Sequence, residues 1–178
     1  MIDKAVFLDR DGVLNNIIIK DGLPFSPSKY EDLKILPGVK DSIIKLKELD
    51  FLCIIVTNQP DVSRGKIEKK TVIKMNDYLN KELKLDDIFV CFHDDNDKCE
   101  CRKPKPGLIL EAAEKWNINL KKSYMIGDRW KDVEAGTLSG CKTIFINNNY
   151  KEQIKSQPNF ISENLLKAVN IIEKNEKN

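Results

Sequence analysis

The apolar residues of the chain gather in five short runs that polar residues scarcely interrupt. These runs cover residues 4–9, 51–56, 88–92, 123–128 and 142–147. They are rich in Val, Ile and Phe, which favour extended backbone. Because the runs are almost continuously apolar, they predict strands that are buried on both faces.

Amphipathic stretches lie between and after these runs. Apolar residues at helical spacing predict helices over residues 37–49, 66–83, 106–116, 131–138 and 162–173. Strands that alternate with helices along the whole chain predict an α/β fold. We expect a doubly wound parallel sheet in a three-layer α/β/α arrangement with right-handed crossovers. Ligands bind at the carboxyl ends of the strands in such sheets.

The domain organisation follows from the length and from the few departures from this alternation. A chain of 178 residues suits one domain, so residues 1–178 are expected to form a single unit. Residues 15–36 form a long connection rich in Pro, Ser and Lys, and residues 91–101 concentrate Cys and His. The Lys- and Asn-rich tail, residues 174–178, is expected to fray.

The net charge and the hydropathy of the chain indicate which kinds of binding partner and which cell compartment to expect. The chain has 30 basic and 28 acidic residues, a net charge of +2. This balance predicts no strong affinity for nucleic acid or an anionic membrane. No apolar run approaches the roughly 20 residues that span a bilayer, and the N-terminus lacks a signal-peptide layout. We therefore expect a cytoplasmic protein.

Paired carboxylates follow the first predicted strand. Asp9 and Asp11 are two residues apart and precede Gly12. Residues i and i+2 of an extended segment project to the same side, so both carboxylates are expected to face one pocket. Their mutual repulsion favours a bound cation, and Mg²⁺ with oxygen ligands fits this chemistry. The simpler interpretation of the motif is a solvated turn.

Polar and charged side chains also follow three later strands. Thr57 and Asn58 end the second strand and suit a phosphate oxygen. Arg102 and Lys103 come after the third strand and the cysteines, and Asp128 follows the fourth strand, with Asp132 one helical turn later. Each fragment is weak alone, but their order at consecutive strand ends predicts a phosphate-handling site.

The cysteines divide into two groups. Cys91, His93, Cys99 and Cys101 supply three thiolates and one imidazole, a complete tetrahedral set for a structural Zn²⁺ ion. A redox pair fits less well because no Cys-x-x-Cys occurs, and chance clustering around the single histidine is the remaining alternative. The other two cysteines, Cys53 and Cys141, are expected to be core thiols.

The combined motifs resemble those of the haloacid dehalogenase superfamily of phosphatases, a Rossmann-like fold. The four motifs are matched in order by Asp9-Arg10-Asp11-Gly12, Thr57-Asn58, Lys103, and Gly127-Asp128-Arg129 with Asp132. The match spans residues 4–136, most of the chain.

The resemblance implies a role for each motif. Asp9 would be the nucleophile that forms an aspartyl-phosphate, and Asp11 would be the general acid and then the general base. Asp9, Asp128 and the main-chain carbonyl of Asp11 would hold Mg²⁺. The residues expected to bind phosphate groups of the substrate are Thr57, Asn58, Gln59, Arg64, Arg102, Lys103 and Arg129.

The Cys/His pattern of residues 91–101, called the zinc loop below, narrows the resemblance to a branch of the superfamily without a large cap domain. This branch comprises D-glycero-D-manno-heptose 1,7-bisphosphate phosphatases and histidinol-phosphate phosphatases. The segments 62–66 and 105–107 look like the heptose enzymes, and a second phosphate would give Arg64 and Arg102 a ligand. The short zinc loop and the Gly127-Asp128-Arg129 sequence also occur in the histidinol-phosphate enzymes. The resemblance thus implies a small phosphorylated metabolite, with a sugar bisphosphate favoured, and a monomer.

Two other classes remain open. A zinc-containing binding module without catalysis would show a basic face with aromatic residues, but residues 93–97 are acidic. A phosphate-transfer enzyme such as a mutase would share the aspartyl-phosphate, but the expected lack of a cap favours a phosphatase.

Overall fold

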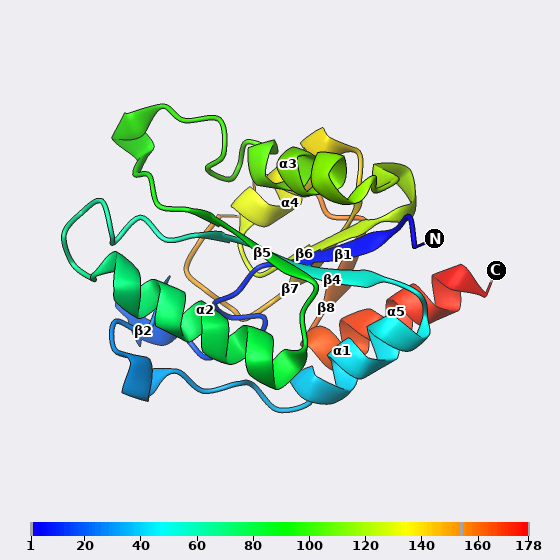
Figure 1. The fold of residues 1–178 in the computed structure, drawn as a ribbon, viewed down its shortest axis with the longest axis horizontal. Coiled ribbons are helices and arrows are strands. Elements are labelled where there is room, and N and C mark those ends of the chain that lie inside the picture. Colours follow the sequence, from blue (N-terminus) through cyan, green and yellow to red (C-terminus); the bar gives the residue numbers. More distant parts are fainter. Residues whose placement is uncertain (1, 154, 178) are drawn as a thin grey trace.

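A parallel six-stranded sheet lies between two layers of helices in the computed structural model, which describes residues 2–153 and 155–177 (Figure 1). The strands of the sheet are β1 (Ala5–Leu8), β4 (Leu52–Asn58), β5 (Asp87–Cys91), β6 (Tyr124–Gly127), β7 (Lys142–Ile146) and β8 (Phe160–Ser162). Their order is β5-β4-β1-β6-β7-β8, and each neighbouring pair is parallel. This arrangement confirms the predicted α/β class with a doubly wound sheet.

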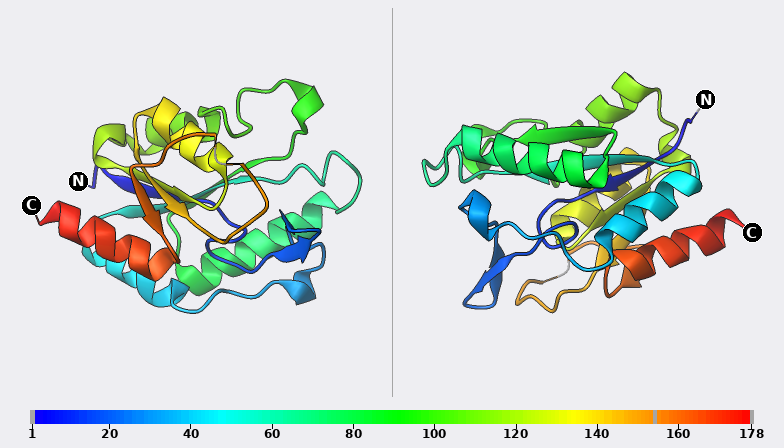
Figure 2. Two further views of the ribbon diagram at one scale, coloured as in Figure 1. Left: turned by 180° about the vertical axis from the view of Figure 1, so that it is seen from behind. Right: turned by 60° about the horizontal axis from the view of Figure 1, so that its bottom comes forward.

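The helices cover both faces of the sheet. They are α1 (Val39–Glu48), α2 (Lys69–Leu83), α3 (Gly107–Trp116), α4 (Trp130–Ser139) and α5 (Leu165–Glu176). Helices α1, α2 and α5 pack into one hydrophobic core, while α3 and α4 lie on the opposite face (Figures 1 and 2). The three-layer arrangement predicted from the sequence is therefore observed.

Alternation along the strands explains why the apolar runs are continuous. In β1, Val6 and Leu8 pack against the α1/α2/α5 layer, whereas Ala5 and Phe7 face the other core. All four are fully buried. A central strand needs apolar residues at every position because both of its faces are covered.

Local signals explain where several helices begin and end. Gly38 precedes α1 with a φ of 76°, and Gly140 ends α4 with a φ of 87°. Both values lie in the left-handed region that glycine adopts without strain. Helix α5 begins after Asn164, whose side chain accepts a hydrogen bond from the Lys167 amide at 2.9 Å.

Three short strands were not predicted from the sequence. The connection between β1 and α1 contains the antiparallel hairpin β2 (Ile18–Lys20) and β3 (Leu23–Phe25), followed by the 3₁₀ turn η1 (Tyr30–Asp32). The third is β8, an edge strand. All three have only three residues and are mostly exposed or half-buried, so they lack a continuous apolar run. The hairpin lies at the end of the molecule opposite the two termini (Figure 2).

The last helix has the predicted length but begins three residues later than expected, at Leu165. It continues to Glu176, so most of the tail expected to fray is helical, while residue 178 lies outside the described part. Glu176 accepts a hydrogen bond from Lys4 at 2.6 Å, which ties this helix to the start of the chain. None of the helices in the described residues has the length and apolar character to span a membrane.

Candidate functional site

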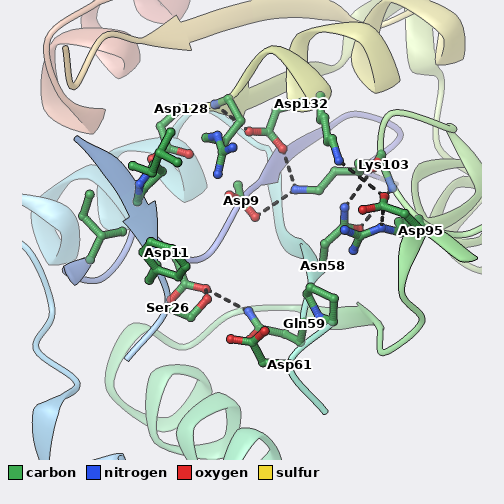
Figure 3. A pocket seen from close by; sticks show the side chains of 18 of the residues that line it. Asp9, Asp11, Ser26, Asn58, Gln59, Asp61, Asp95, Lys103, Asp128 and Asp132 are labelled. Atoms are coloured by element: carbon green, nitrogen blue, oxygen red, sulfur yellow. Dashed lines mark hydrogen bonds and ion pairs between the residues drawn. The ribbon is translucent and has the colours of Figure 1, made fainter. Parts of the chain in front are cut away.

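A pocket of about 320 Å³ opens at the carboxyl edge of the sheet. Carboxylates and cations from segments far apart in the sequence line it, and the β2–β3 hairpin forms one wall (Figure 3). Asp9, Asp128 and Asp132 lie on one side of the pocket together with Lys103.

The strand order brings these residues together. Asp9 follows β1, and its amide donates to the Ile126 carbonyl of β6 at 2.9 Å. Asp128 directly follows β6, the neighbour of β1 on one side, while β4 is the neighbour on the other. The motifs predicted at successive strand ends therefore meet at one edge.

Lys103 is the cation at the centre of this cluster. Its ammonium donates to Asp9 Oδ1 at 2.8 Å, to Asp132 Oδ1 at 2.5 Å and to the Val56 carbonyl at 2.8 Å. Burial opposes the charge, since only 2% of the residue is exposed, but the two carboxylates outweigh it. The pKa of Lys103 therefore lies above its ordinary value.

Three carboxylates crowd around one point beside this lysine. Oxygen atoms of Asp9, Asp128 and Asp132 all lie within 4.8 Å of one another. Burial, opposed by Lys103, raises the pKa of Asp9 to about 6. Burial and the charges of Asp9 and Asp132 raise the pKa of Asp128 well above its ordinary value. Such crowding favours a proton or a cation between the groups.

The residues of this cluster fit Mg²⁺. Asp128 Oδ1 is buried and has no hydrogen-bond partner in the structure. A buried acceptor without a partner costs stability unless a ligand satisfies it. Hard oxygen donors from Asp9, Asp128 and Asp132 are the type that Mg²⁺ takes. The sequence singled out Asp132 without giving it a role, and its carboxylate also accepts hydrogen bonds from Lys103 and from the Arg129 amide.

The second oxygen of Asp128 is held by residues that the sequence analysis missed. Tyr150 donates its hydroxyl to Asp128 Oδ2, and Asn148 donates to the same oxygen at 3.3 Å. Gly12 passes so close that a Cβ there would lie 1.9 Å from Oδ2, and its φ of 81° also requires glycine. Asp128 is therefore fixed through one oxygen while the other is free to bind a ligand.

Asp11 lines the same pocket as Asp9 but is bound to several donors. Its carboxylate accepts hydrogen bonds from Arg10, Asn15, Ser26 and Gln59 at 2.8 to 3.3 Å. Burial opposes ionisation, but the Arg10 guanidinium and these hydrogen bonds keep the pKa of Asp11 below its ordinary value. Arg10 is itself fully buried and also donates to Asn76 at 3.1 Å.

The polar side chains at the end of β4 form hydrogen bonds that hold neighbouring site residues in place. Asn58 lines the pocket, and its side chain exchanges two hydrogen bonds with the main chain of Lys103, at 2.9 and 3.1 Å. Gln59 donates to Asp11 at 2.8 Å and to the buried Thr57 hydroxyl at 3.0 Å. In this structure, the side chains expected to bind phosphate therefore position Lys103 and Asp11.

The three predicted phosphate-binding arginines line the pocket, and each is paired with a carboxylate. Arg129 forms two hydrogen bonds with Glu152, at 2.5 and 2.6 Å. Arg64 pairs with Asp94 through two hydrogen bonds, and Arg102 donates to Asp95 at 2.8 Å. Nothing in the sequence marked these carboxylates, because the partners lie 7 to 30 positions from their arginines.

The four predicted zinc ligands converge at the end of β5, whose last residue is Cys91. Their ligand atoms lie within 4.8 Å of one another, with Cys91 Sγ 3.6 Å from His93 Nδ1 and 3.7 Å from Cys99 Sγ. Zn–S bonds of about 2.3 Å in a tetrahedron imply sulfur separations of about 3.8 Å. The three observed sulfur separations are 3.1, 3.5 and 3.7 Å, so the set fits Zn²⁺ after a small outward shift of Cys101. The segment also contains the 3₁₀ turn η2 (Asp95–Asp97).

The remaining cysteines lie in the core. Cys53 and Cys141 are buried, and burial raises the pKa of Cys53 to about 12 and of Cys141 to about 11. Both are therefore protonated thiols at neutral pH, as the sequence predicted.

Comparisons with known proteins point to one family. A family model described as HAD-hydrolase-like matches residues 100–168. The D-glycero-beta-D-manno-heptose-1,7-bisphosphate 7-phosphatase of Helicobacter pylori J99 is 38% identical over 140 residues, covering 75% of this chain and 77% of that protein. The D-glycero-alpha-D-manno-heptose-1,7-bisphosphate 7-phosphatase of Campylobacter jejuni is 35% identical over 158 residues. That match covers 86% of this chain and 87% of that protein.

Solved structures agree with this assignment. The D,D-heptose 1,7-bisphosphate phosphatase of B. bronchiseptica, complexed with magnesium and phosphate, superposes with a TM-score of 0.80 at 25% identity. The match covers 97% of this chain and 99% of that protein. The similarity in sequence and structure, together with the carboxylate cluster at the strand ends, shows that this chain belongs to the haloacid dehalogenase-like family of phosphatases.

Proposed function

We propose that this phosphatase hydrolyses a small sugar bisphosphate, namely the 7-phosphate of D-glycero-D-manno-heptose 1,7-bisphosphate. One observation carries the choice of a bisphosphate: a single pocket has lysine or arginine side chains at both of its ends. Lys103 lies beside Asp9 at one end, while Arg64, Arg102 and Lys131 gather at the other. Two separate phosphate groups would each meet fixed positive charge.

Asp9 is the nucleophile in this proposal. Its carboxylate attacks phosphorus, the bond from phosphorus to the sugar oxygen breaks, and an aspartyl-phosphate forms. Lys103, which already contacts Asp9 at 2.8 Å, binds a phosphoryl oxygen and stabilises its charge. Asn58 holds the main chain of Lys103 in place through its two hydrogen bonds. Water then attacks the aspartyl-phosphate and releases inorganic phosphate.

Asp11 moves the proton in both steps. Once the substrate has removed two of its hydrogen-bond donors, Asp11 takes up a proton from solvent, donates it to the leaving sugar oxygen, and later accepts one from the attacking water. Its carboxylate is saturated with donors in the structure, so one oxygen must be released first. Ser26 and Gln59 line the pocket, and we propose that the substrate displaces these two donors while Arg10 and Asn15 keep Asp11 oriented.

The same residues define the metal requirement. We propose that Mg²⁺ is held by Asp9, Asp128 and the main-chain carbonyl of Asp11, with Asp132 nearby. When bound, the ion offsets the repulsion between the carboxylate nucleophile and the anionic ester. Tyr150 and Asn148 orient Asp128 for this role through its other oxygen.

Zn²⁺ has a structural role in this proposal. Cys91, His93, Cys99 and Cys101 complete a four-ligand site with no open position. Arg102 and Lys103 directly follow the last ligand, so closing this loop fixes both cations relative to Asp9. Residues 1–178 act as one phosphatase domain, and a monomer suffices because one chain supplies every residue named.

Histidinol phosphate is the second candidate substrate because its phosphatases share the short zinc loop. It carries one phosphate and a cationic amine, so it would leave the Arg64/Arg102/Lys131 end without an anion. That difference favours the bisphosphate.

Phosphate release with Mg²⁺ tests the proposal directly. The panel comprises both anomers of heptose 1,7-bisphosphate, heptose 7-phosphate and histidinol phosphate. We expect the bisphosphate to have the highest kcat/KM, and Asp9→Asn to lose at least about 10³-fold in kcat while remaining folded. Asp77→Asn removes an exposed carboxylate on α2 and serves as the matched control. Normal turnover by Asp9→Asn would exclude Asp9 as the nucleophile, and preference for histidinol phosphate would reject the bisphosphate assignment.

A further inference from the structure

Three cations at the far end of the pocket converge on one carboxylate, that of Asp95. Asp95 Oδ1 lies 2.8 Å from Arg102 Nε and 3.6 Å from Lys131 Nζ, and Oδ2 lies 3.8 Å from Arg64 Nη2. All four residues line the pocket that contains Asp9 (Figure 3). Neither the resemblance nor the proposed mechanism gives Asp95 a role.

The cations are better fixed than the carboxylate that they bind. The Asp95 side chain is 63% exposed, whereas that of Arg102 is 11% exposed. Arg102 also donates to the His93 carbonyl at 3.3 Å, and Arg64 has further partners in Asp94 and Asp61. Asp95 can therefore rotate into solvent while both arginines keep other contacts.

A phosphate group competes well for this position. It carries up to two negative charges and more acceptor oxygens than a carboxylate, so it can bind several cations at once. Exposed ion pairs such as those of Asp95 contribute little to stability because solvent screens the charges. A second phosphate on the substrate would therefore replace Asp95 at modest cost.

We propose that Asp95 is a specificity-determining residue, an internal counter-ion that occupies the distal phosphate position and is displaced only by a substrate with a second phosphate. This inference rests on the proposed function. A substrate with one phosphate reaches Asp9 and Lys103 but leaves Asp95 on the three cations. The affinity for a bisphosphate is then the gain from binding its distal phosphate minus the cost of displacing Asp95.

The variant Asp95→Asn tests this competition because it removes the charge and preserves the size of the side chain. We expect KM for heptose 1,7-bisphosphate to fall by about three- to tenfold, the range for loss of a few exposed ion pairs. The KM for p-nitrophenyl phosphate, which has one phosphate, should stay within about twofold, and kcat for both should change little. Zinc content and thermal unfolding check that the loop stays intact.

Glu100→Gln is the matched control. Glu100 is an exposed carboxylate of the same loop, and it pairs with Lys105 rather than with the three cations. An equal fall in KM in this control would mean that net charge alone is responsible and would overturn the inference. A higher or unchanged bisphosphate KM in Asp95→Asn would also overturn it, because Asp95 would then orient Arg102 rather than compete. Should Asp95→Asn lose zinc, Asp95→Ser is judged by the same criteria.

Failure of the proposed function gives a different result. If the unmodified protein does not hydrolyse heptose 1,7-bisphosphate, the substrate assignment falls whatever Asp95→Asn does. If it does hydrolyse the bisphosphate and the variant shows no gain in affinity, only the role of Asp95 is refuted.

Discussion

Replacing Lys103 by methionine tests the buried ion-pair cluster, because it removes the charge and keeps a side chain of similar length. The ammonium has three hydrogen-bond partners, among them Asp9 and Asp132, and its side chain is only 3% exposed. Solvent therefore screens these pairs very little. Lys103→Met leaves two carboxylates and the Val56 carbonyl without their shared donor.

The size of the effect follows from this geometry. Removing one partner of a buried ion pair destabilises a protein by about 3–5 kcal/mol. Protonation of Asp9 limits this loss of stability. Its pKa of about 6 rises further without Lys103, so the carboxyl group takes up a proton near neutral pH. We therefore expect the free energy of unfolding at pH 7 to fall by about 3 kcal/mol, near the lower end of that range.

Urea unfolding in magnesium-free buffer, with zinc retained, measures this loss. The matched control is Lys105→Met, which removes a half-exposed lysine paired with the exposed Glu100 and should change stability by less than about 1 kcal/mol. Addition of Mg²⁺ should restore part of the stability of Lys103→Met, since a cation again lies among the carboxylates. A loss of stability below about 1 kcal/mol in Lys103→Met would contradict this expectation and would show that Lys103 is not the buried partner of both carboxylates.

Two further predictions concern the metal sites. We expect the unmodified protein to purify with about one Zn²⁺ per chain, and Cys99→Ser to purify without it and to unfold at lower temperature. Cys141→Ser, the control, should keep its metal. Elemental analysis and thermal unfolding check this, and full zinc content in Cys99→Ser would contradict the assignment. Tyr150→Phe removes one donor to Asp128 and should weaken Mg²⁺ binding by about tenfold, measured by calorimetry, with Tyr78→Phe on α2 as the control. Unchanged affinity in Tyr150→Phe would exclude the proposed orienting role of its hydroxyl.

The parts of the fold that were predicted share a physical basis. Strands β1 and β4 are buried on both faces, so their sequences must be apolar at nearly every position, and this is visible without a structure. The hairpin β2–β3 and the edge strand β8 meet no such demand because they are short and partly exposed. Tertiary contacts rather than local pattern therefore decide that these segments are strands.

The candidate site divides in the same way. The chemical groups could be read from the amino-acid sequence alone: carboxylates at Asp9, Asp11 and Asp128, a cation at Lys103, and a four-ligand set at 91–101. The carboxylates and the zinc ligands were recognisable because each lies within a few residues of a strand end or of its fellow ligands, where spacing alone constrains geometry. Lys103 was recognisable only by its position after the last zinc ligand, Cys101.

Which of these groups contact one another depends on the fold and was not visible in the sequence. The tertiary structure placed Asp132 against Lys103, assigned Asn58 to the main chain of Lys103, and paired each predicted phosphate-binding arginine with a carboxylate. The parallel strand order β5-β4-β1-β6 brings residues as far apart in sequence as Asp9 and Lys103 to one edge. Sequence patterns record whether a position is buried or polar, whereas the partner of a buried charge depends on which strands are neighbours.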